Sequence, residues 1–290
     1  MHKTLLSTRA MPHREHTNGH AAPERQFRPL VVHALYTGIS RGLAADVLAA
    51  HAAGGRAVTV CTALIVASHG HVTDVLPVPS DTVDAQIQHA LAHAGPTGVK
   101  IGIVSEAAAV ERLFRRLDDQ PTGPVVLDLT LSGPSGEDII NQQGLEALKA
   151  HLARPDLVMV RRRDAALVAG MAIESLDDAQ VAVQRLHRLG ARNVLLRCGQ
   201  LPSRFFDDPQ ARPDHTADLF YDGSEFALFE APHFELPGLH GSSSLLGMIL
   251  LKELTEKKPV IEAIQQAKGY VAESLRRSHE QGPTDVPAFF

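Results

Sequence analysis

Short runs of aliphatic residues alternate with longer segments of helical pattern along most of this chain. The clearest run is Val125-Val126-Leu127-Asp128-Leu129, and similar runs cover residues 30–35, 57–67, 99–104, 157–160 and 194–197. Runs of this length and composition are typical of strands buried on both faces of a parallel sheet. Helical patterns separate them over residues 43–51, 81–93, 105–117, 144–152 and 176–189. The alternation predicts a three-layer α/β/α fold with a mainly parallel central sheet.

Three further segments predict strands at the edges of this sheet. Residues 68–80 alternate valines with polar residues and contain two prolines, a composition typical of an exposed edge flap. Residues 218–221 and 225–229 predict two strands joined by an Asp-Gly turn. Because no internal repeat or linker interrupts this order, we expect one domain over residues 29–290, after a flexible leader over residues 1–28.

The composition of the chain limits the kinds of molecule that we expect it to bind. The chain has a formal net charge of −5 and a pI near 6.3, whereas nucleic-acid-binding proteins usually carry a basic face. It contains two cysteines and no apolar run of membrane-spanning length. Its 16 histidines are mostly scattered, without the spacing of metal ligands. We therefore expect a cytoplasmic protein that binds a small molecule, and neither a nucleic acid nor a membrane.

Five loops follow predicted strands or precede the last buried helix. In parallel α/β sheets, ligands bind outside the carboxyl ends of the strands. The side chains of these loops should therefore meet at one crevice. The loops cover residues 38–42, 128–138, 161–164, 197–200 and 240–244.

The last of these loops predicts an anion site. His240, Gly241, Ser242, Ser243 and Ser244 run directly into an apolar segment that is too hydrophobic for a surface helix. Serine is a strong N-cap, and the first turn of a helix leaves backbone N–H groups without acceptors. These donors and the helix dipole favour a phosphate. An ordinary capped core helix is the alternative interpretation of the same residues.

Five short motifs extend over the chain in a fixed order. They are Gly42-Leu43-Ala44-Ala45-Asp46, Thr62-Ala63-Leu64, Lys100-Ile101-Gly102-Ile103, Val126-Leu127-Asp128 with Ser135-Gly136 after it, and His240-Gly241 with the three serines. Their order and spacing resemble those of the hydroxymethylpyrimidine/phosphomethylpyrimidine kinases of thiamine synthesis, within the ribokinase-like superfamily. The resemblance covers nearly everything after the leader and implies a ribokinase-like fold.

The resemblance also implies a function and a set of site residues. It implies ATP and Mg²⁺ as cofactors, a small heterocycle as substrate, and a homodimer formed through the flap. It assigns phosphoryl transfer to Gly241, Ser242, Ser243 and Ser244, nucleotide binding to Arg161, Asp164, Arg197 and His240, metal binding to Asp128 and Asp164, and the substrate pocket to Tyr36, Gly38, Ala67 and Ile103. Two alternatives stay open: Asp128 could instead cap the turn after its strand, and Arg197 could be a solvated residue at the end of a strand.

Several of these positions differ from the pattern of the family. Ser243 and Ser244 stand where the family has Gly and Cys, and a serine hydroxyl is a weak base without an activating partner. Arg161-x-x-Asp164 replaces Asn-x-x-Glu, so that a cation stands near the expected magnesium. Ala67 aligns with a Gln that bonds the pyrimidine in the family.

Two interpretations of function therefore stay open. The first is a kinase that transfers the γ-phosphoryl group of ATP to a hydroxymethyl or phosphomethyl group of a small heterocycle. The second is a catalytically inactive relative that binds a small phosphorylated ligand or a protein partner. A serine hydrolase that uses Ser242 or Ser244 is disfavoured, because neither lies in a Gly-x-Ser-x-Gly motif.

Overall fold

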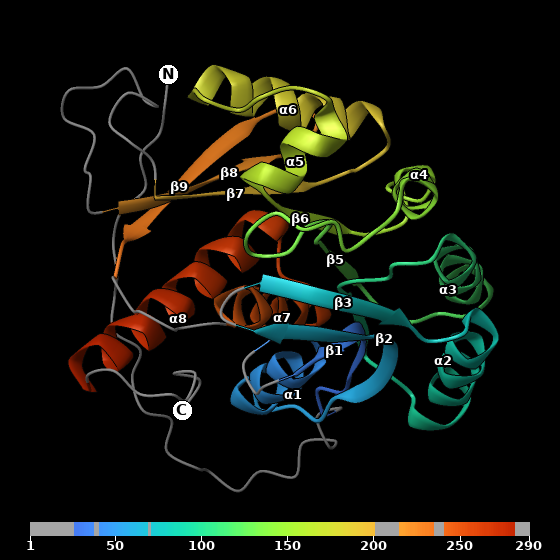
Figure 1. Cartoon of the computed structure of the whole chain (residues 1–290). Helices are drawn as coiled ribbons and strands as arrows, with labels where there is room; N and C mark the ends of the chain where they lie inside the picture. Colours follow the sequence, from blue (N-terminus) through green and yellow to red (C-terminus); the bar gives the residue numbers. More distant parts are fainter. Residues whose placement is uncertain (1–25, 38–40, 69–70, 201–214, 235–240, 282–290) are drawn as a thin grey trace, which may run out of the picture.

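The computed structural model describes residues 26–37, 41–68, 71–200, 215–234 and 241–281. Within these residues the chain forms one nine-stranded sheet (Figure 1). Its strand order is β3-β2-β1-β4-β5-β6-β7-β8-β9. The strands are β1 Pro29–Tyr36, β2 Val58–Ser68, β3 His71–Pro77, β4 Gly98–Ile101, β5 Val125–Leu129, β6 Leu157–Arg161, β7 Val194–Gln200, β8 His215–Tyr221 and β9 Phe226–Pro232. Each segment predicted as a strand contributes to this sheet, but the segment predicted over residues 99–104 leaves it after Ile101.

The pairing of the strands is parallel in the centre of the sheet and antiparallel at its edges. Parallel pairing joins β1 to β2 and β4 and continues through β5, β6 and β7. Antiparallel pairing adds β3 at one edge, and β8 and β9 at the other. The mainly parallel sheet and the small edge flap, formed by β2 and β3, are therefore confirmed. Because β1 lies between β2 and β4, the chain order reverses there, where open α/β sheets form a ligand crevice.

Helices cover both faces of the sheet and complete the three predicted layers (Figure 1). On one face lie α1 Gly42–Ala52, α7 Ser242–Thr255 and α8 Val260–Gln281. On the other lie α2 Ser80–Ala94, α3 Ala107–Asp119, α4 Gln142–Ala150, α5 Arg162–Ala169 and α6 Leu176–Arg188. Successive residues of a strand point to opposite faces. Thus Leu30 and Val32 pack with the α2–α6 layer, and Val31 packs with α1, α7 and α8.

Helix α7 is the buried helix that the sequence predicts. Met248 and Leu250 in its centre are fully buried between the sheet and its neighbouring helices. Of the four residues expected to cap it, Gly241 rather than a serine occupies the N-cap position. Its φ of 95° lies in the left-handed region, which glycine adopts without steric cost. The three serines therefore form the first turn of α7.

Two features differ from the sequence-based expectation, namely one additional helix and the start of the packed body. Helix α5 is not predicted, because its first turn follows directly on β6 and begins with an arginine-rich stretch. Phe27, which we place in the predicted leader, is buried in the cluster around α1. The backbone N–H of Arg28 donates to Thr97 Oγ1 at 3.0 Å, so the packed body begins before residue 29.

None of the described helices is both long and apolar enough to cross a membrane.

Candidate active site

A cavity of about 260 Å³ lies where the N-terminus of α7 meets the strands β1, β5, β6 and β7 and the loops after β1, β4 and β5. A wider groove of about 660 Å³ beside α3 and α4 contains none of the predicted site residues. The smaller cavity brings together nine of them, from segments far apart in the sequence. They are Tyr36, Ile103, Asp128, Arg161, Arg197, Gly241, Ser242, Ser243 and Ser244.

The first turn of α7 places at this cavity backbone donors that have no acceptor within the helix. The first helical hydrogen bond is donated by the amide of Leu245 to the carbonyl of Gly241, at 3.0 Å. The amides of the three preceding serines therefore have no acceptor inside the helix. With the helix dipole, they favour a bound anion.

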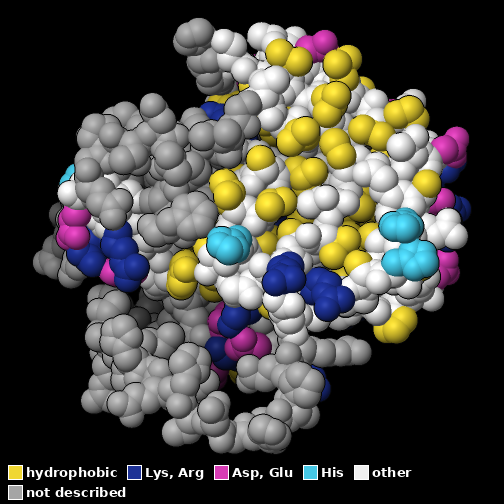
Figure 2. Space-filling view, turned by 90° about the horizontal axis from the view of Figure 1, so that it is seen from below, with side chains coloured by type: hydrophobic (Ala, Val, Ile, Leu, Met, Phe, Trp, Pro, Cys, Tyr) yellow, Lys and Arg dark blue, Asp and Glu magenta, His cyan; other side chains and the backbone are white. Residues whose placement is uncertain are grey.

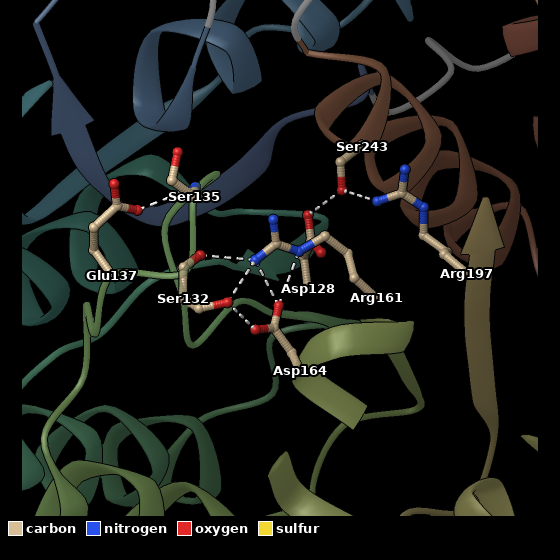
Figure 3. Close-up of polar contacts among 8 residues, drawn as sticks. All are labelled: Asp128, Ser132, Ser135, Glu137, Arg161, Asp164, Arg197 and Ser243. Atoms are coloured by element: carbon tan, nitrogen blue, oxygen red, sulfur yellow. Dashed lines mark hydrogen bonds and ion pairs between the residues drawn. The ribbon is translucent and has the colours of Figure 1, made fainter. Parts of the chain in front are cut away.

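Ser243 joins two charged residues of opposite sign at this helix terminus. Its hydroxyl donates to Asp128 Oδ2 at 2.7 Å and accepts from the guanidinium of Arg197 at 2.6 Å. Figure 3 shows the three side chains converging from α7, β5 and β7. Arg197 is thereby held next to the amides of α7, where a phosphate would need a cation.

Asp128 is in contact with a buried lysine, Lys100, which is itself paired with a second buried aspartate, Asp46. Lys100 and Asp46 are fully excluded from solvent, and Lys100 Nζ lies 2.9 Å from Asp46 Oδ1 and 3.7 Å from Asp128 Oδ2. Burial alone would raise the pKa of Asp128, but Lys100, Arg197 and the Ser243 hydrogen bond outweigh it and lower that pKa. The carboxylate of Asp128 therefore stays ionised at the cavity wall. Lys100 and Asp46 are not among the predicted site residues, although both belong to the five motifs, and that membership is the signal that could have found them.

His33 lines the cavity as well, and the sequence does not reveal it because it lies inside an aliphatic strand. It is buried, and its Nδ1 has no hydrogen-bond partner among the described residues. Burial lowers the pKa of His33 to about 4. The neutral ring packs directly on Gly102, since a Cβ there would come within 2.0 Å of its Cδ2. His33 therefore adds a neutral polar group to the cavity, which it lines.

Arg161 and Asp164 form a closed set of contacts beside the cavity (Figure 3). Two nitrogens of Arg161 donate to Asp164 Oδ2 at 2.8 and 2.6 Å, and one of them also donates to the carbonyl of Ser132 at 2.7 Å. The hydroxyl of Ser132 donates to Asp164 Oδ1 at 2.7 Å. Asp164 is fully buried, whereas Arg161 lines the cavity. Arg161 is thus oriented by Asp164, and its positive charge is partly neutralised.

The residues present do not by themselves form a metal site. Within the described parts of the chain, no group of three or more His, Cys, Asp or Glu side chains is placed to hold an ion. Asp164 has both carboxylate oxygens bonded to Arg161 and Ser132, and Asp128 has one oxygen bonded to Ser243. Magnesium is usually bound by one or two carboxylates together with nucleotide phosphates. Metal binding by Asp128 and Asp164 stays a prediction, and Asp164 would first have to release Arg161.

The predicted substrate residues are only partly brought together. Tyr36 and Ile103 line the cavity, and burial raises the pKa of Tyr36 to about 12, so that its hydroxyl keeps its proton. Ala67 does not line the cavity, and its backbone is bonded to the Thr37 hydroxyl at 3.0 and 3.1 Å. Gly38 and the nucleotide-site residue His240 lie outside the described residues.

Solved structures of small-molecule kinases share this architecture. The pyridoxal kinase of Staphylococcus aureus, in complex with AMP-PCP and pyridoxal, superimposes with a TM-score of 0.75 over 87% of this chain and 89% of its own, at 22% identity. The phosphomethylpyrimidine kinase of Clostridium difficile gives a TM-score of 0.70 over 86% of this chain and 99% of its own, at 19% identity. The fold is therefore that of the ribokinase-like kinases.

Sequence comparison places the chain within this class. The model of the phosphomethylpyrimidine kinase family matches residues 38–288, and the chain belongs to that family. The hydroxymethylpyrimidine/phosphomethylpyrimidine kinase of Aquifex aeolicus is 28% identical over 226 residues, which are 78% of this chain and 85% of that protein. The Bacillus subtilis enzyme of the same name is 24% identical over 268 residues, or 91% of this chain and 96% of that protein. The predicted family is confirmed, and with it the kinase class.

Proposed function

We propose that this chain is an ATP-dependent kinase that phosphorylates the hydroxymethyl or phosphomethyl group of a small pyrimidine. The observation that carries the proposal is the N-terminus of α7, whose unpaired amides lie at a cavity flanked by Arg161 and Arg197. Phosphoryl transfer depends mainly on positioning and on neutralisation of charge, and these groups can supply both. The names of the relatives in Aquifex aeolicus and Bacillus subtilis support the pyrimidine as substrate.

Each group of the cavity has a role in this proposal. The γ-phosphate of ATP lies at the serine amides of α7, and Arg197 binds one of its oxygens. The acceptor lies between this helix terminus and the wall formed by Tyr36, Ile103 and His33, which line the same cavity. Magnesium carried on the triphosphate would neutralise charge on the phosphate oxygens. We assign no protein ligand to it.

The rate of the proposed reaction is limited by the weak base at the anion site. Ser244, which stands where the family has Cys, is buried and has no useful basicity near neutral pH. General-base assistance is typically worth roughly 10²–10⁴-fold, and loose phosphoryl transfer reduces that need. We therefore expect a working but slow kinase. No observation favours the inactive alternative.

The test is release of ADP from magnesium-ATP in the presence of a hydroxymethylpyrimidine, with pyridoxal as a second acceptor. We expect faster release with the pyrimidine than without an acceptor. Gly241→Val should abolish the thermal stabilisation by ATP, because valine is strained at positive φ and its side chain crowds the amides. The control is Gly54→Ala, since Gly54 also has a positive φ but has open space and lies away from the cavity.

Two results would contradict the proposal. If Gly241→Val folds, as judged by circular dichroism, and still binds ATP as tightly as the parent, the α7 terminus is not the nucleotide site. If the parent binds ATP but no acceptor increases the release of ADP, the protein is a binding relative rather than a kinase.

We further propose that the active form is a homodimer. Leu35, Leu64 and Leu76 lie side by side across β1, β2 and β3, and all three are 39–50% exposed. An unpaired edge hairpin that exposes such a row invites uncontrolled association unless a partner covers it. Figure 2 shows hydrophobic side chains gathered on the side of the molecule where α1 and β2 lie. A second copy of the chain is the occupant that we propose for this row.

The cytoplasm is the proposed location. Both cysteines, Cys61 and Cys198, are free, as is usual in a reducing compartment. Burial also raises the pKa of Cys198 to about 12, so that this thiol stays protonated and unreactive.

A further inference from the structure

Ser243 has the surroundings of an activated nucleophile. Its hydroxyl donates to Asp128 Oδ2, and Lys100 Nζ lies 3.7 Å from the same oxygen. A nucleophile bonded to a base, with the base oriented by a third group, is the arrangement that activates serine hydroxyls. Arg197 adds a cation 2.6 Å from the attacking oxygen, where it can neutralise a phosphoryl group.

The position of Ser243 in the cavity sets it apart from its neighbours. Of the three serines in the first turn of α7, it is the one whose hydroxyl bonds Asp128 and Arg197. It is half-buried and lines the cavity in which we propose that the phosphates bind. Ser244, the next residue, is buried to 6% exposure.

We propose that Ser243 is a self-phosphorylation site, modified by the nucleoside triphosphate bound at the N-terminus of α7. This inference rests on the proposed function, because it requires ATP in the cavity. In the step, the Ser243 Oγ–phosphorus bond forms as the bond between the γ-phosphorus and the bridging oxygen of the β-phosphate breaks. ADP leaves, and the hydroxyl proton passes along the existing hydrogen bond to Asp128 and from there to water.

The product would be retained by the same groups that favour its formation. A phosphoserine in the first turn of a helix is stabilised by the dipole and by nearby arginines. Here Arg197 contacts the hydroxyl directly, and Arg161 lines the same cavity. The added phosphate would occupy the position of the γ-phosphate and bring negative charge next to Asp128. Phosphorylation of Ser243 should therefore block binding of the next ATP and turn the kinase off.

The test is incubation of the full chain with magnesium-ATP and no acceptor, followed by intact-protein mass spectrometry and fragmentation. We expect a time-dependent gain of one phosphoryl group on Ser243, no gain with AMP-PCP, and kinase activity that falls in step with the gain. Ser243→Ala should show no gain, and Asp128→Asn should slow it roughly hundredfold through loss of the base. Ser243→Gly is a second variant without the hydroxyl, to be used if alanine disturbs the fold.

The matched control is Ser224→Ala. The Ser224 hydroxyl also bonds an aspartate, Asp222, at 2.8 Å, but this exposed pair lies in the β8–β9 turn and neither residue lines the cavity. Its loss should leave the gain of mass unchanged. A gain on any other residue, or an equal rate in Asp128→Asn, would overturn the inference.

Absence of any gain of mass would overturn it as well. A parallel measurement of ADP release with a hydroxymethylpyrimidine then separates the two proposals. Turnover without modification leaves the proposed function intact, whereas the absence of both turnover and ATP binding removes the proposed function too.

Discussion

Lys100 on β4 and Asp46 on α1 form an ion pair in which neither side chain is exposed to solvent. The ammonium lies 2.9 and 3.1 Å from the two carboxylate oxygens. Burial would lower the pKa of Lys100, but Asp46 and Asp128 outweigh it and raise that pKa. The lysine therefore stays charged and links the α1 layer to the carboxylate at the cavity wall.

Replacement of the lysine should be strongly destabilising. Lys100→Met leaves Asp46 and Asp128 buried without their cation, and the loss of one partner of a buried pair typically costs about 3–5 kcal/mol. Urea denaturation measures the change in the free energy of unfolding. Arg276→Ala is the control, because Arg276 pairs with Glu273 at the exposed surface and its loss should cost less than about 1 kcal/mol. Equal losses in the two variants would contradict a structural role for the buried pair.

Two helical glycines should respond to alanine with opposite signs. At Gly247 in α7, a Cβ would lie 2.7 Å from Cε of Lys100, whose ammonium is held by Asp46 and cannot easily move. Gly247→Ala should therefore destabilise the protein by about 1–3 kcal/mol through overpacking. At Gly269 in α8, a Cβ meets nothing within 4 Å, so Gly269→Ala should stabilise by up to about 1 kcal/mol. The thermal unfolding midpoints of both variants test this prediction. A Gly247→Ala variant more stable than the parent would mean that the Lys100 side chain can move away from the added methyl group.

Stability should fall as the pH falls from about 6.5 towards 4, in part because of His33. The pKa of its buried ring is lowered from 6.5 to about 4, so in this window the unfolded state binds the proton and the folded state does not. Between pH 7 and pH 5, this difference should cost the parent about 2 kcal/mol of unfolding free energy. The charges of Asp46, Lys100 and Asp128 also act on the pKa of this ring. All three residues are present both in the parent and in a variant changed only at position 33.

The comparison that isolates this effect is His33→Gln, measured by urea denaturation at both pH values. The variant should lose about 2 kcal/mol less than the parent between pH 7 and pH 5, whatever its stability at pH 7. An identical loss in the two proteins would show that His33 is accessible to protons in the folded state.

The leucine row on the flap should determine the oligomeric state. Leu64→Asp places a charge between Leu35 and Leu76, its neighbours on β1 and β3. A buried, unpaired charge at an interface is costly, so the variant should sediment as a monomer at micromolar concentration. Leu167→Asp, at an exposed position on α5, should leave the dimer unchanged. A parent protein that is already monomeric would refute the proposed dimer.

The parts of the fold that depend on local pattern could be predicted from the sequence. Strands such as Val125–Leu129 are buried on both faces, so their residues are uniformly apolar and stand out from the flanking turns. Helix α5 could not be predicted, because it follows β6 without a turn and begins with two arginines, and its N-cap residue, Arg161, is held by a contact with a distant residue. Arg161 bonds the carbonyl of Ser132, which is 29 residues away.

The same distinction applies to the candidate site. The N-terminus of α7, where we propose that phosphate binds, depends on residues adjacent in the chain and could be predicted from Gly241 and the three serines. The bond between Ser243 and Asp128 joins residues 115 positions apart, and the pair of Lys100 and Asp46 joins residues 54 apart. A lysine in a short strand would ordinarily be placed at the surface, and only the tertiary partner accounts for its burial.

The contact between His33 and Gly102 means that two positions share a single volume. Any side chain at 102 would displace the imidazole, since its Cβ would overlap the ring carbons. Among related proteins, a residue larger than glycine at 102 should therefore occur only with a residue smaller than histidine at 33. The two positions should covary, and any evolutionary change in the shape of the cavity wall at 33 depends on what stands at 102.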